Sequence, residues 1–541
     1  MVPQILARGL IILSLAAIFG TATPIPTGPR DGSGNATTQY SPPQKLTWGP
    51  CPARFASTPN VTCATYPVPL DWDRPDGTET ITLGMLRLTA RGDPSRRIGN
   101  LFVNPGGPGV QATDAVARLA AAAGRLGPGS TAELLERFDV VGLDPRGVGL
   151  STPVRCDAGL FNERASLFPR TRGEFDDLLV HNAALGASCR ALSGRLVDFV
   201  DTISAARDHE AVRLALGGGK GGGGDEKASF LGLSYGTQLF SQYAEMYPEG
   251  VRAMVLDGAL QHSQSESSDL LIESAAYETT LQKFFEWCDS TNGSADCALL
   301  RDHGDDGAGA RQAFLDVLAK ARDAPIPAPG CDDGPATGCR SNVTEEEARF
   351  NAQGLLLETA GWPALGRALR EARDDANATL LSQAQPIAVG DEDGYEDSYL
   401  FGGAAVQCQD WTHATASTWA GIAELQILGA ASAPLTRGAS QSYRVQASCA
   451  GWPSPQRNRE RPLSPYAGGG ADVLLVNSVY DPSTSYAWAL GLRAELGERA
   501  MLLTRDGAGH TSWSLGGEAT DAVNRYLVNL TLPEPGTVVD S

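Results

Sequence analysis

The chain has 541 residues, of which 42% are hydrophobic and 20% are charged, and its formal net charge is −20 with an isoelectric point near 4.8. This length allows more than one domain and a large buried core. The acidic balance excludes a nucleic-acid-binding protein, because such proteins need basic surfaces to contact phosphates.

The N-terminal 22 residues have the features of a secretory signal peptide. Arg8 supplies a positive charge, and residues 9–20 form an apolar run that is too short to span a bilayer comfortably. Small residues follow and predict cleavage near Ala22, so residues 1–22 are interpreted as a signal peptide; an uncleaved signal anchor is the alternative. Residues 23–44 are rich in Pro, Gly, Ser and Thr and are predicted to be a disordered lead-in. We therefore expect a secreted, extracellular protein without stable membrane association.

Seven apolar runs, each ending in turn residues, predict buried strands. They cover residues 81–88, 100–104, 138–144, 228–234, 251–258, 472–478 and 500–504. Helix-compatible stretches lie between them, at residues 114–126, 201–216 and 237–249. Continuous apolar strands that alternate with helices predict an α/β fold with a mostly parallel sheet covered on both faces.

The alternation stops between the fifth and the sixth predicted strand. That region holds acidic, helix-compatible segments at residues 268–289 and 345–375, together with six of the ten cysteines. We interpret residues 261–469 as a large, mainly helical cap inserted into a core formed by residues 45–260 and 470–533. An insertion at this point would lie over the carboxyl ends of the strands, where such sheets bind their ligands.

The cysteines and the glycosylation sequences agree with secretion. The cysteine count is even and no Cys-x-x-Cys occurs, so a zinc or redox motif is not expected. Pairing in sequence order is our hypothesis, because sequence does not fix connectivity; it gives Cys51–Cys63, Cys156–Cys189, Cys288–Cys297, Cys331–Cys339 and Cys408–Cys449. The candidate N-glycosylation sites are Asn35, Asn60, Asn292, Asn342, Asn377 and Asn529.

The stretch FLGLSYGTQL, residues 230–239, places Ser234 in a Gly-x-Ser-x-Gly pattern. In a chain with 62 glycines this pattern also arises by chance, so its context decides its meaning. Ser234 lies where a predicted strand meets a predicted helix, which is the context of a nucleophile elbow. The flanking glycines allow a tight turn that lifts the hydroxyl clear of the sheet. A serine hydroxyl is a weak nucleophile and needs a base.

A base and an acid follow Ser234 in the chain. Of the six histidines, only His510 follows the last predicted strand in a short glycine loop, and Asp481 lies just beyond the sixth predicted strand. The order Ser, Asp, His, each at the carboxyl end of a strand, predicts a catalytic triad of Ser234, Asp481 and His510. Asp257 also follows a predicted strand and is the alternative acid.

Two backbone N–H groups are predicted to form an oxyanion hole. One belongs to Tyr235, directly after the nucleophile, and the other to Gly107 in the loop NPGGPG. Taken singly, an Asp-Pro turn, a loop histidine and a glycine turn each have a structural explanation. Their joint order at strand ends favours the catalytic interpretation.

Five motifs together resemble the secreted tripeptidyl aminopeptidase group of α/β-hydrolases, which are relatives of prolyl iminopeptidases. The motifs are NPGGPG (104–109), DPRGVGLS (144–151), FLGLSYGT (230–237), VYDPSTS (479–485) and GAGHTSW (507–513). The resemblance covers most of the chain after the signal. It implies an α/β-hydrolase fold and the release of tripeptides, or of single residues, from free N-termini. Prolyl iminopeptidases usually have His-Gly-Gly-Pro-Gly, and Pro105 replaces that histidine here, which favours the tripeptidyl side.

An aminopeptidase must also bind a protonated amine, and carboxylates of the cap should do so through charge-assisted hydrogen bonds. The segment AVQCQD, residues 405–410, resembles an Ala-x-x-Cys-x-Asp segment of the group. The resemblance implies that Cys408 tethers the loop bearing Asp410 and that Asp410 binds the amine; a surface or helix-capping role of Asp410 is the alternative. Asp144 and Arg146 either contact substrate or form a structural ion pair near the elbow.

The leading function is therefore a secreted serine aminopeptidase with an acyl-enzyme intermediate. An esterase, lactonase or other small-molecule hydrolase with the same triad is the runner-up, and a non-catalytic binding protein on this scaffold is the third hypothesis. A cap pocket with two or more carboxylates facing Ser234 would favour the aminopeptidase, and a wide apolar pocket the esterase. No cofactor or metal is expected. The expected partners are peptides with free N-termini, and the chain is expected to be a monomer.

Overall fold

The computed structural model of the chain describes residues 46–125, 129–217, 227–291, 296–300, 309–333, 339–382, 399–464 and 470–541. The predicted signal peptide and lead-in lie outside these residues, as do Asn35 and Asn292. Within the described ranges, every helix is too short or too polar to span a bilayer.

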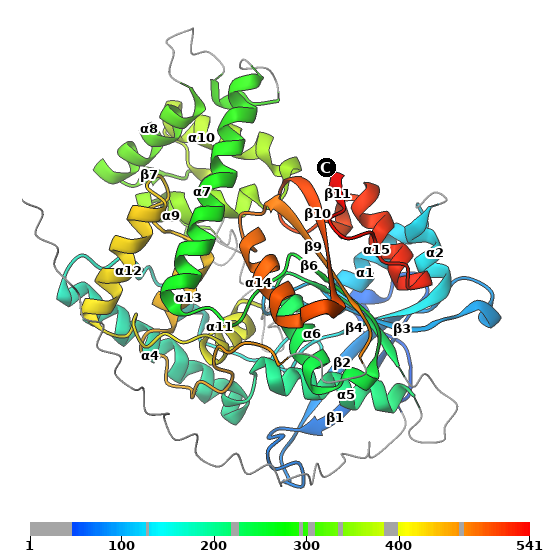
Figure 1. Cartoon of the computed structure of the whole chain (residues 1–541). Helices are drawn as coiled ribbons and strands as arrows, with labels where there is room; N and C mark the ends of the chain where they lie inside the picture. The colour runs from blue at the N-terminus through cyan, green and yellow to red at the C-terminus, as the bar shows by residue number, and fades with distance from the viewer. Residues whose placement is uncertain are drawn as a thin grey trace, which may run out of the picture. The chain divides into compact units, whose positions relative to one another are not determined.

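A nine-stranded sheet lies at the centre of the fold (Figure 1). In spatial order its strands are β1 (Val61–Pro69), β2 (Thr80–Leu88), β4 (Phe138–Leu143), β3 (Gly99–Asn104), β5 (Ala228–Leu233), β6 (Val251–Asp257), β9 (Val473–Tyr480), β10 (Ala500–Ala508) and β11 (Val538–Asp540). β2 pairs antiparallel with both β1 and β4, and all other neighbouring strands are parallel. This confirms the mostly parallel sheet that the apolar runs predict.

All seven predicted strands are present in this sheet, and its two further strands, β1 and β11, are its edges. β1 contains Pro67 and Pro69, which is compatible with an edge position because proline has no N–H for a central ladder. β11 has only three residues and pairs with β10 on one side. Both edges therefore lack the long apolar run that marks a central parallel strand.

Helices cover both faces of the sheet. One face carries α1 (Ala112–Ala123), α2 (Ser130–Arg137) and α15 (Gly517–Asn529); the other carries α5 (Thr202–Leu216), α6 (Tyr235–Met246) and α14 (Tyr486–Leu496) (Figure 1). Successive residues of a strand point to opposite faces. Leu101 and Val103 of β3 thus join the apolar cluster that contains α1 and α15. Phe102, between them, stacks on Phe230 of β5 at 5.5 Å on the other face.

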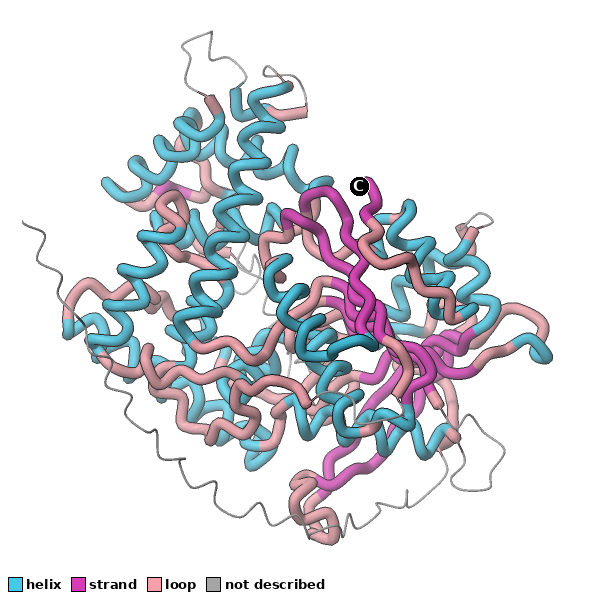
Figure 2. The backbone as a smooth tube through the Cα atoms, in the orientation of Figure 1, coloured by secondary structure: helices cyan, strands magenta, loops and turns pink. Residues whose placement is uncertain are grey.

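The chain between β6 and β9 is mainly helical, as predicted (Figure 2). Its helices are α7 (Glu266–Ser290), α8 (Ala310–Asp323), α9 (Glu345–Leu356), α10 (Trp362–Asp374), α11 (Tyr399–Asp410), α12 (Trp419–Ser432) and α13 (Gln441–Cys449). A separate apolar cluster, which includes Phe284, Phe314 and Leu365, holds part of this helical insertion together. The exact boundaries of the core and of the cap remain a prediction.

The remaining described elements are short or lie outside the sheet. Besides short 3-10 helices, they are α3 (Ala158–Asn162), α4 (Arg172–Ser193) and the two-residue strands β7 (Ile326–Pro327) and β8 (Asn342–Val343).

Five disulfides join the cysteines in sequence order. They are Cys51–Cys63, Cys156–Cys189, Cys288–Cys297, Cys331–Cys339 and Cys408–Cys449. The last three lie in the helical insertion, and Cys408–Cys449 joins α11 to α13. No cysteine in the described ranges is free. Such a disulfide framework is characteristic of proteins from oxidising compartments.

The four described glycosylation sequences differ in accessibility. Asn60 and Asn529 are exposed. Asn342 and Asn377 are partly buried, and their side-chain oxygens accept hydrogen bonds from within the chain. Asn60 and Asn529 are therefore the better placed to carry a glycan.

Candidate active site

Ser234 occupies the sharp turn between β5 and α6. Its backbone has φ 56° and ψ −127°, and φ in this region is unfavourable for a residue with a Cβ. Hydrogen bonds hold the turn: the Ser234 N–H donates to the Asp257 carbonyl at 2.9 Å, and the Thr237 N–H donates to the Ser234 carbonyl at 2.8 Å. The strained turn is the geometry of a nucleophile elbow.

The glycines of the Gly-x-Ser-x-Gly pattern are required by close backbone contacts. A Cβ atom at Gly232 would lie 2.4 Å from the Gly236 carbonyl oxygen, and one at Gly236 would lie 2.6 Å from the Asn104 carbonyl oxygen. Carbon atoms do not approach oxygens this closely, so neither position accepts a larger side chain without movement of the backbone. The pattern around Ser234 is therefore a structural requirement of this turn.

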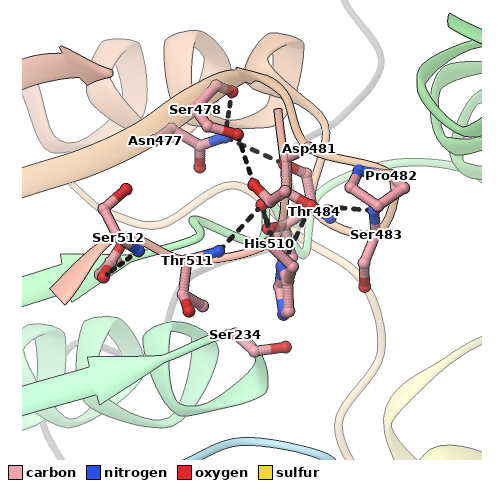
Figure 3. Close-up of polar contacts among 12 residues, drawn as sticks. Ser234, Asn477, Ser478, Asp481, Pro482, Ser483, Thr484, His510, Thr511 and Ser512 are labelled. Carbon is pink, nitrogen blue, oxygen red and sulfur yellow. Dashed lines mark hydrogen bonds and ion pairs between the residues drawn. The ribbon is translucent and has the colours of Figure 1, made fainter. Parts of the chain in front are cut away.

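Asp481 and His510 form a hydrogen-bonded pair next to Ser234. The His510 Nδ1 atom lies 3.0 and 2.9 Å from the two carboxylate oxygens of Asp481. Asp481 follows β9 and His510 follows β10, so neighbouring parallel strands bring the two loops together. Figure 3 shows the His510 ring pointing from Asp481 towards Ser234. The three residues of the predicted triad thus lie together at the carboxyl ends of the strands.

Hydrogen bonds around Asp481 hold its carboxylate in a fixed orientation. The Asp481 side chain is buried and accepts hydrogen bonds from the Ser483 N–H (2.9 Å), the Thr484 N–H (2.8 Å) and the Thr484 hydroxyl (2.9 Å). Burial of the His510 ring opposes its positive charge, but the charge and hydrogen bond of Asp481 outweigh this effect and raise the pKa of His510. The pair therefore makes His510 a stronger base.

The NPGGPG loop runs directly against the elbow. A Cβ atom at Gly106, where φ is +97°, would lie 2.7 Å from the Ser234 Cβ and 3.1 Å from the Tyr235 backbone nitrogen. Gly107 and Pro108 line the same cavity as Ser234. Tyr235 begins α6, and the first N–H groups of a helix have no partner within the helix. Gly107 and Tyr235 therefore remain our candidates for the oxyanion hole.

A cavity of about 620 Å³, solvent at its mouth included, opens beside Ser234. The core contributes Gly107, Pro108 and Ser234 to its wall, and most of the rest comes from the helical insertion. Four lining residues are acidic: Glu266, Asp269, Glu273 and Glu460. None of the lining residues that the structure describes is Lys, Arg or His. The cavity thus brings four acidic side chains together close to the candidate nucleophile.

Three of these carboxylates are fixed by hydrogen bonds. Glu266 accepts from the N–H groups of Thr415 and Ala416, at 2.9 and 3.1 Å. Glu273 accepts from the N–H groups of residues 441 and 442 and from the side-chain amide of residue 353. Glu460 accepts from the N–H and hydroxyl of residue 412. These bonds hold the three carboxyl groups in place.

Asp269 is the least compensated of the four. It lies one turn before Glu273 on α7 and is 8% exposed. Burial, together with the neighbouring charge of Glu273, raises the pKa of Asp269 to about 8. The pKa of Glu273 is raised as well, mainly by burial. A cation that entered the cavity would relieve the repulsion between these two carboxylates.

The position of Asp410 does not fit the predicted role of amine binding. Asp410 ends α11 and is fully buried, and it is not among the residues that line the cavity. Its carboxylate accepts hydrogen bonds from the Thr202 N–H (3.0 Å), the Gln238 amide (3.1 Å) and the Asn458 amide (3.1 Å). Asp410 therefore connects the helical insertion to α5 and α6, and the carboxylates that face the cavity are others.

The DPRG segment is structural. Arg146 is fully buried and forms an ion pair with Asp208, with a distance of 2.6 Å between Nη2 and Oδ1. Asp144 is not its partner: it accepts hydrogen bonds from the N–H groups of Thr113 and Leu150, at 2.9 and 2.7 Å. The predicted structural ion pair is present, but Asp208 supplies its acid.

Sequence reasoning did not identify several residues at this site. The cavity carboxylates of α7 lie in a segment interpreted only as acidic and helical. Arg505 of β10 was not predicted to belong to the site either. Its guanidinium donates hydrogen bonds to the carbonyl groups of residues 508, 509 and 511, on both sides of His510. The spacing of Glu266, Asp269 and Glu273 by three and four residues was the available signal, because it places them on one face of a helix.

Two family models match the chain in the regions that hold the candidate triad. The model described as "alpha/beta hydrolase fold" matches residues 100–313, which include Ser234. The model described as "TAP-like protein" matches residues 433–539, which include Asp481 and His510.

Three curated relatives match most of the chain. It is 31% identical over 552 residues to "Carboxylesterase B" of Mycobacterium tuberculosis, a match that covers 96% of each chain. It is 29% identical over 514 residues to "Serine protease Hip1" of the same organism, which covers 91% of this chain and 90% of the relative. It is 26% identical over 494 residues to "Tripeptidyl aminopeptidase" of Streptomyces lividans, which covers 89% of this chain and 84% of the relative.

Proposed function

Because this chain belongs to the family of TAP-like α/β-hydrolases, we propose that it is a secreted serine peptidase that releases tripeptides, or single residues, from free N-termini. The observation that carries this proposal is the group of four carboxylates in the cavity beside Ser234. A peptide with a free N-terminus brings a positive charge that such a cavity would bind, whereas an uncharged ester gains nothing from it.

In the proposed mechanism, Ser234 attacks the carbonyl carbon of the scissile amide. The Nε2 atom of His510 accepts the hydroxyl proton, and Asp481 fixes the tautomer of the ring and stabilises its protonated form. The N–H groups of Tyr235 and Gly107 donate to the oxygen that becomes negative in the tetrahedral intermediate. Collapse of this intermediate transfers the proton from His510 to the leaving amine and leaves an acyl-enzyme on Ser234.

The second half of the proposed reaction repeats these roles with water. His510 takes a proton from a water molecule that attacks the acyl-enzyme, and the proton then returns to the Ser234 oxygen as the short peptide leaves. The enzyme is unchanged after both steps, and the residues of the chain supply every proton transfer.

We assign amine binding to Asp269 and Glu273 of α7 in place of Asp410. Both carboxylates line the cavity and are one helical turn apart. Below about pH 8 the buried Asp269 holds a proton in the free enzyme, so an arriving ammonium group would drive that proton into the solvent and restore the carboxylate. The position of this anchor relative to Ser234 would determine how many residues are released.

An esterase that uses the same triad is the second candidate. The relative named "Carboxylesterase B" favours it, at 31% identity over 552 residues. A simple acyl ester carries no ammonium group, so an esterase would leave the cavity carboxylates without a cationic partner. Substitution of those carboxylates separates the two functions.

Extracellular location is part of the proposal. Five disulfides in the described chain would not persist in a reducing cytosol. The apolar N-terminal segment of the sequence supplies the expected signal.

Substitution of Asp269 by asparagine is expected to lower kcat/KM for a free-amine tripeptide amide by about 10- to 100-fold, since one charge-assisted hydrogen bond contributes roughly 1.5–3 kcal/mol. The N-acetylated form of the same peptide should react no more slowly with the variant than with the unmodified enzyme. Steady-state kinetics with the two peptides measures both effects.

The matched control is Glu286→Gln, which removes one charge from the same helix at an exposed position paired with Lys283. We expect this control to retain the full rate with both peptides. Equal rates for Asp269→Asn and Glu286→Gln with the free-amine peptide would contradict the assignment of Asp269.

A further inference from the structure

A buried carboxylate next to the triad has no role in the mechanism above. Asp257 ends β6, the strand between β5 and β9, and its side chain is fully buried. Its neighbours in the ladder are Leu233, just before the nucleophile, and Val476 of β9. Asp257 therefore lies at the carboxyl ends of the strands, as do the three residues of the candidate triad.

Asp257 is hydrogen-bonded to the loops of both the nucleophile and the base. Its backbone carbonyl accepts from the Ser234 N–H at 2.9 Å. Its Oδ2 atom accepts from the Ser512 N–H at 2.8 Å and the Trp513 N–H at 2.7 Å, directly after His510 in the chain. One residue thus fixes the turn that carries the hydroxyl and the loop that carries the imidazole.

The next residue brings this segment into contact with the imidazole itself. Gly258 has φ +71°, and a Cβ atom there would lie 3.3 Å from the Cε1 atom of His510. A side chain at this position would therefore press against the ring. The absence of a side chain lets the turn after Asp257 pass directly along the catalytic histidine.

The charge of Asp257 is only partly compensated. Its Oδ1 atom is buried and has no hydrogen-bond partner in the part of the chain that the structure describes. Burial raises the pKa of Asp257 to about 6, so the carboxylate is ionised at neutral pH. The charged groups that face it are His510 and Arg505. The Arg505 guanidinium donates hydrogen bonds to carbonyl groups of the loop that carries His510. The Asp257 carboxylate accepts hydrogen bonds from N–H groups of the same loop.

We propose that Asp257 is a second positioning carboxylate of His510: its Oδ2 atom fixes the histidine loop, and its negative charge stabilises the protonated imidazole that forms while Ser234 reacts. Asp481 contacts the ring directly, and Asp257 acts on it from the neighbouring strand. Asp257 is therefore not the alternative acid that the sequence allowed, because Asp481 holds the Nδ1 atom. This inference rests on the proposed triad but not on peptide specificity.

The sign of the effect on pH dependence follows from the charges around His510. The groups that raise the pKa of His510 are Asp481, Asp257 and Glu273, while burial lowers it. His510 must be neutral to accept the Ser234 proton, so activity falls as pH drops through the pKa of His510. Asp257→Asn removes one negative charge, lowers that pKa and moves the acidic limb of the rate profile to lower pH.

The test measures the rate at which a fluorophosphonate labels Ser234, as a function of pH. We expect Asp257→Asn to label about tenfold more slowly at its plateau, equivalent to about 1.4 kcal/mol of activation free energy, and its acidic limb to lie at lower pH than that of the unmodified enzyme. An unmoved limb would overturn the proposal, whether or not the plateau rate falls. If the unmodified enzyme is not labelled at all, the proposed triad itself is wrong.

Asp144→Asn is the matched control, since Asp144 is also buried at the end of a strand and accepts two backbone N–H groups, but does not contact the histidine loop. The acidic limb of the labelling-rate profile of this control should lie at the same pH as that of the unmodified enzyme. Should Asp257→Asn not fold, NMR titration of the His510 ring in the Ser234→Ala enzyme replaces it. We expect a second step near pH 6 from Asp257; a single step would contradict the proposal.

Discussion

Replacement of Ser234 by alanine should lower kcat for every substrate by at least about 10⁴-fold, because the proposed chemistry begins at its hydroxyl. Alanine keeps the Cβ atom, so the strained turn and its hydrogen bonds to the backbone are retained. The melting temperature should therefore stay close to that of the unmodified enzyme. Steady-state rates together with a thermal melt measure the two effects separately.

Ser241→Ala provides the control for this variant. Ser241 lies on α6, the helix that begins at the elbow, and its hydroxyl donates only to a carbonyl of the same helix. This control should keep nearly the full rate. If Ser234→Ala is as active as Ser241→Ala, the serine mechanism is wrong.

Substitution of Asp481 by asparagine should lower kcat by about 10⁴-fold, the loss expected when the acid of a serine triad becomes an amide. Both carboxylate oxygens lie within hydrogen-bond distance of the His510 Nδ1 atom. An amide can present its NH₂ group to that nitrogen instead, which holds the imidazole in the tautomer that cannot accept the Ser234 proton at Nε2. Single-turnover acylation with an activated ester measures this loss at the chemical step.

Two further variants make this prediction specific. Asp506→Asn changes an exposed aspartate of β10 and should leave kcat unchanged. Asp257→Asn should cost only about tenfold, since Asp257 does not bond to the ring. If Asp257→Asn lowered kcat much more than Asp481→Asn, the acid of the triad would be Asp257 and not Asp481.

The sequence predicted the parts of the fold that depend on local patterns. Apolar runs marked all the inner strands of the sheet. For the parallel strands among them the reason is that a strand covered on both faces must be apolar almost throughout. The edge strand β1 was not predicted because Pro67 and Pro69 interrupt its pattern and only its pairing with β2 makes it a strand. The turn at Ser234 was predictable, because close contacts at Gly232 and Gly236 leave a signature of glycines.

The binding cavity was less predictable, because its wall depends on how distant segments pack. The motif around Cys408 predicted a loop, but Cys408 and Asp410 lie in the helix α11. Sequence gives no measure of burial, and partners from α5 and α6 surround the Asp410 carboxylate. Asp269 and Glu273 lie in a helix whose apolar and acidic residues alternate around its axis. Only the tertiary arrangement shows which of its acidic residues face Ser234.

The central claim is that the cavity lined by four acidic side chains selects substrates with a free N-terminus. The most direct measurement compares the rates at which the purified enzyme releases a chromophore from three compounds: a free-amine tripeptide amide, its N-acetylated form and a short acyl ester. We predict efficient release from the free-amine peptide and little or none from its acetylated form. Hydrolysis of the ester alone would contradict the claim: the triad would remain, the carboxylates of α7 would lose their assigned role, and the enzyme would be an esterase.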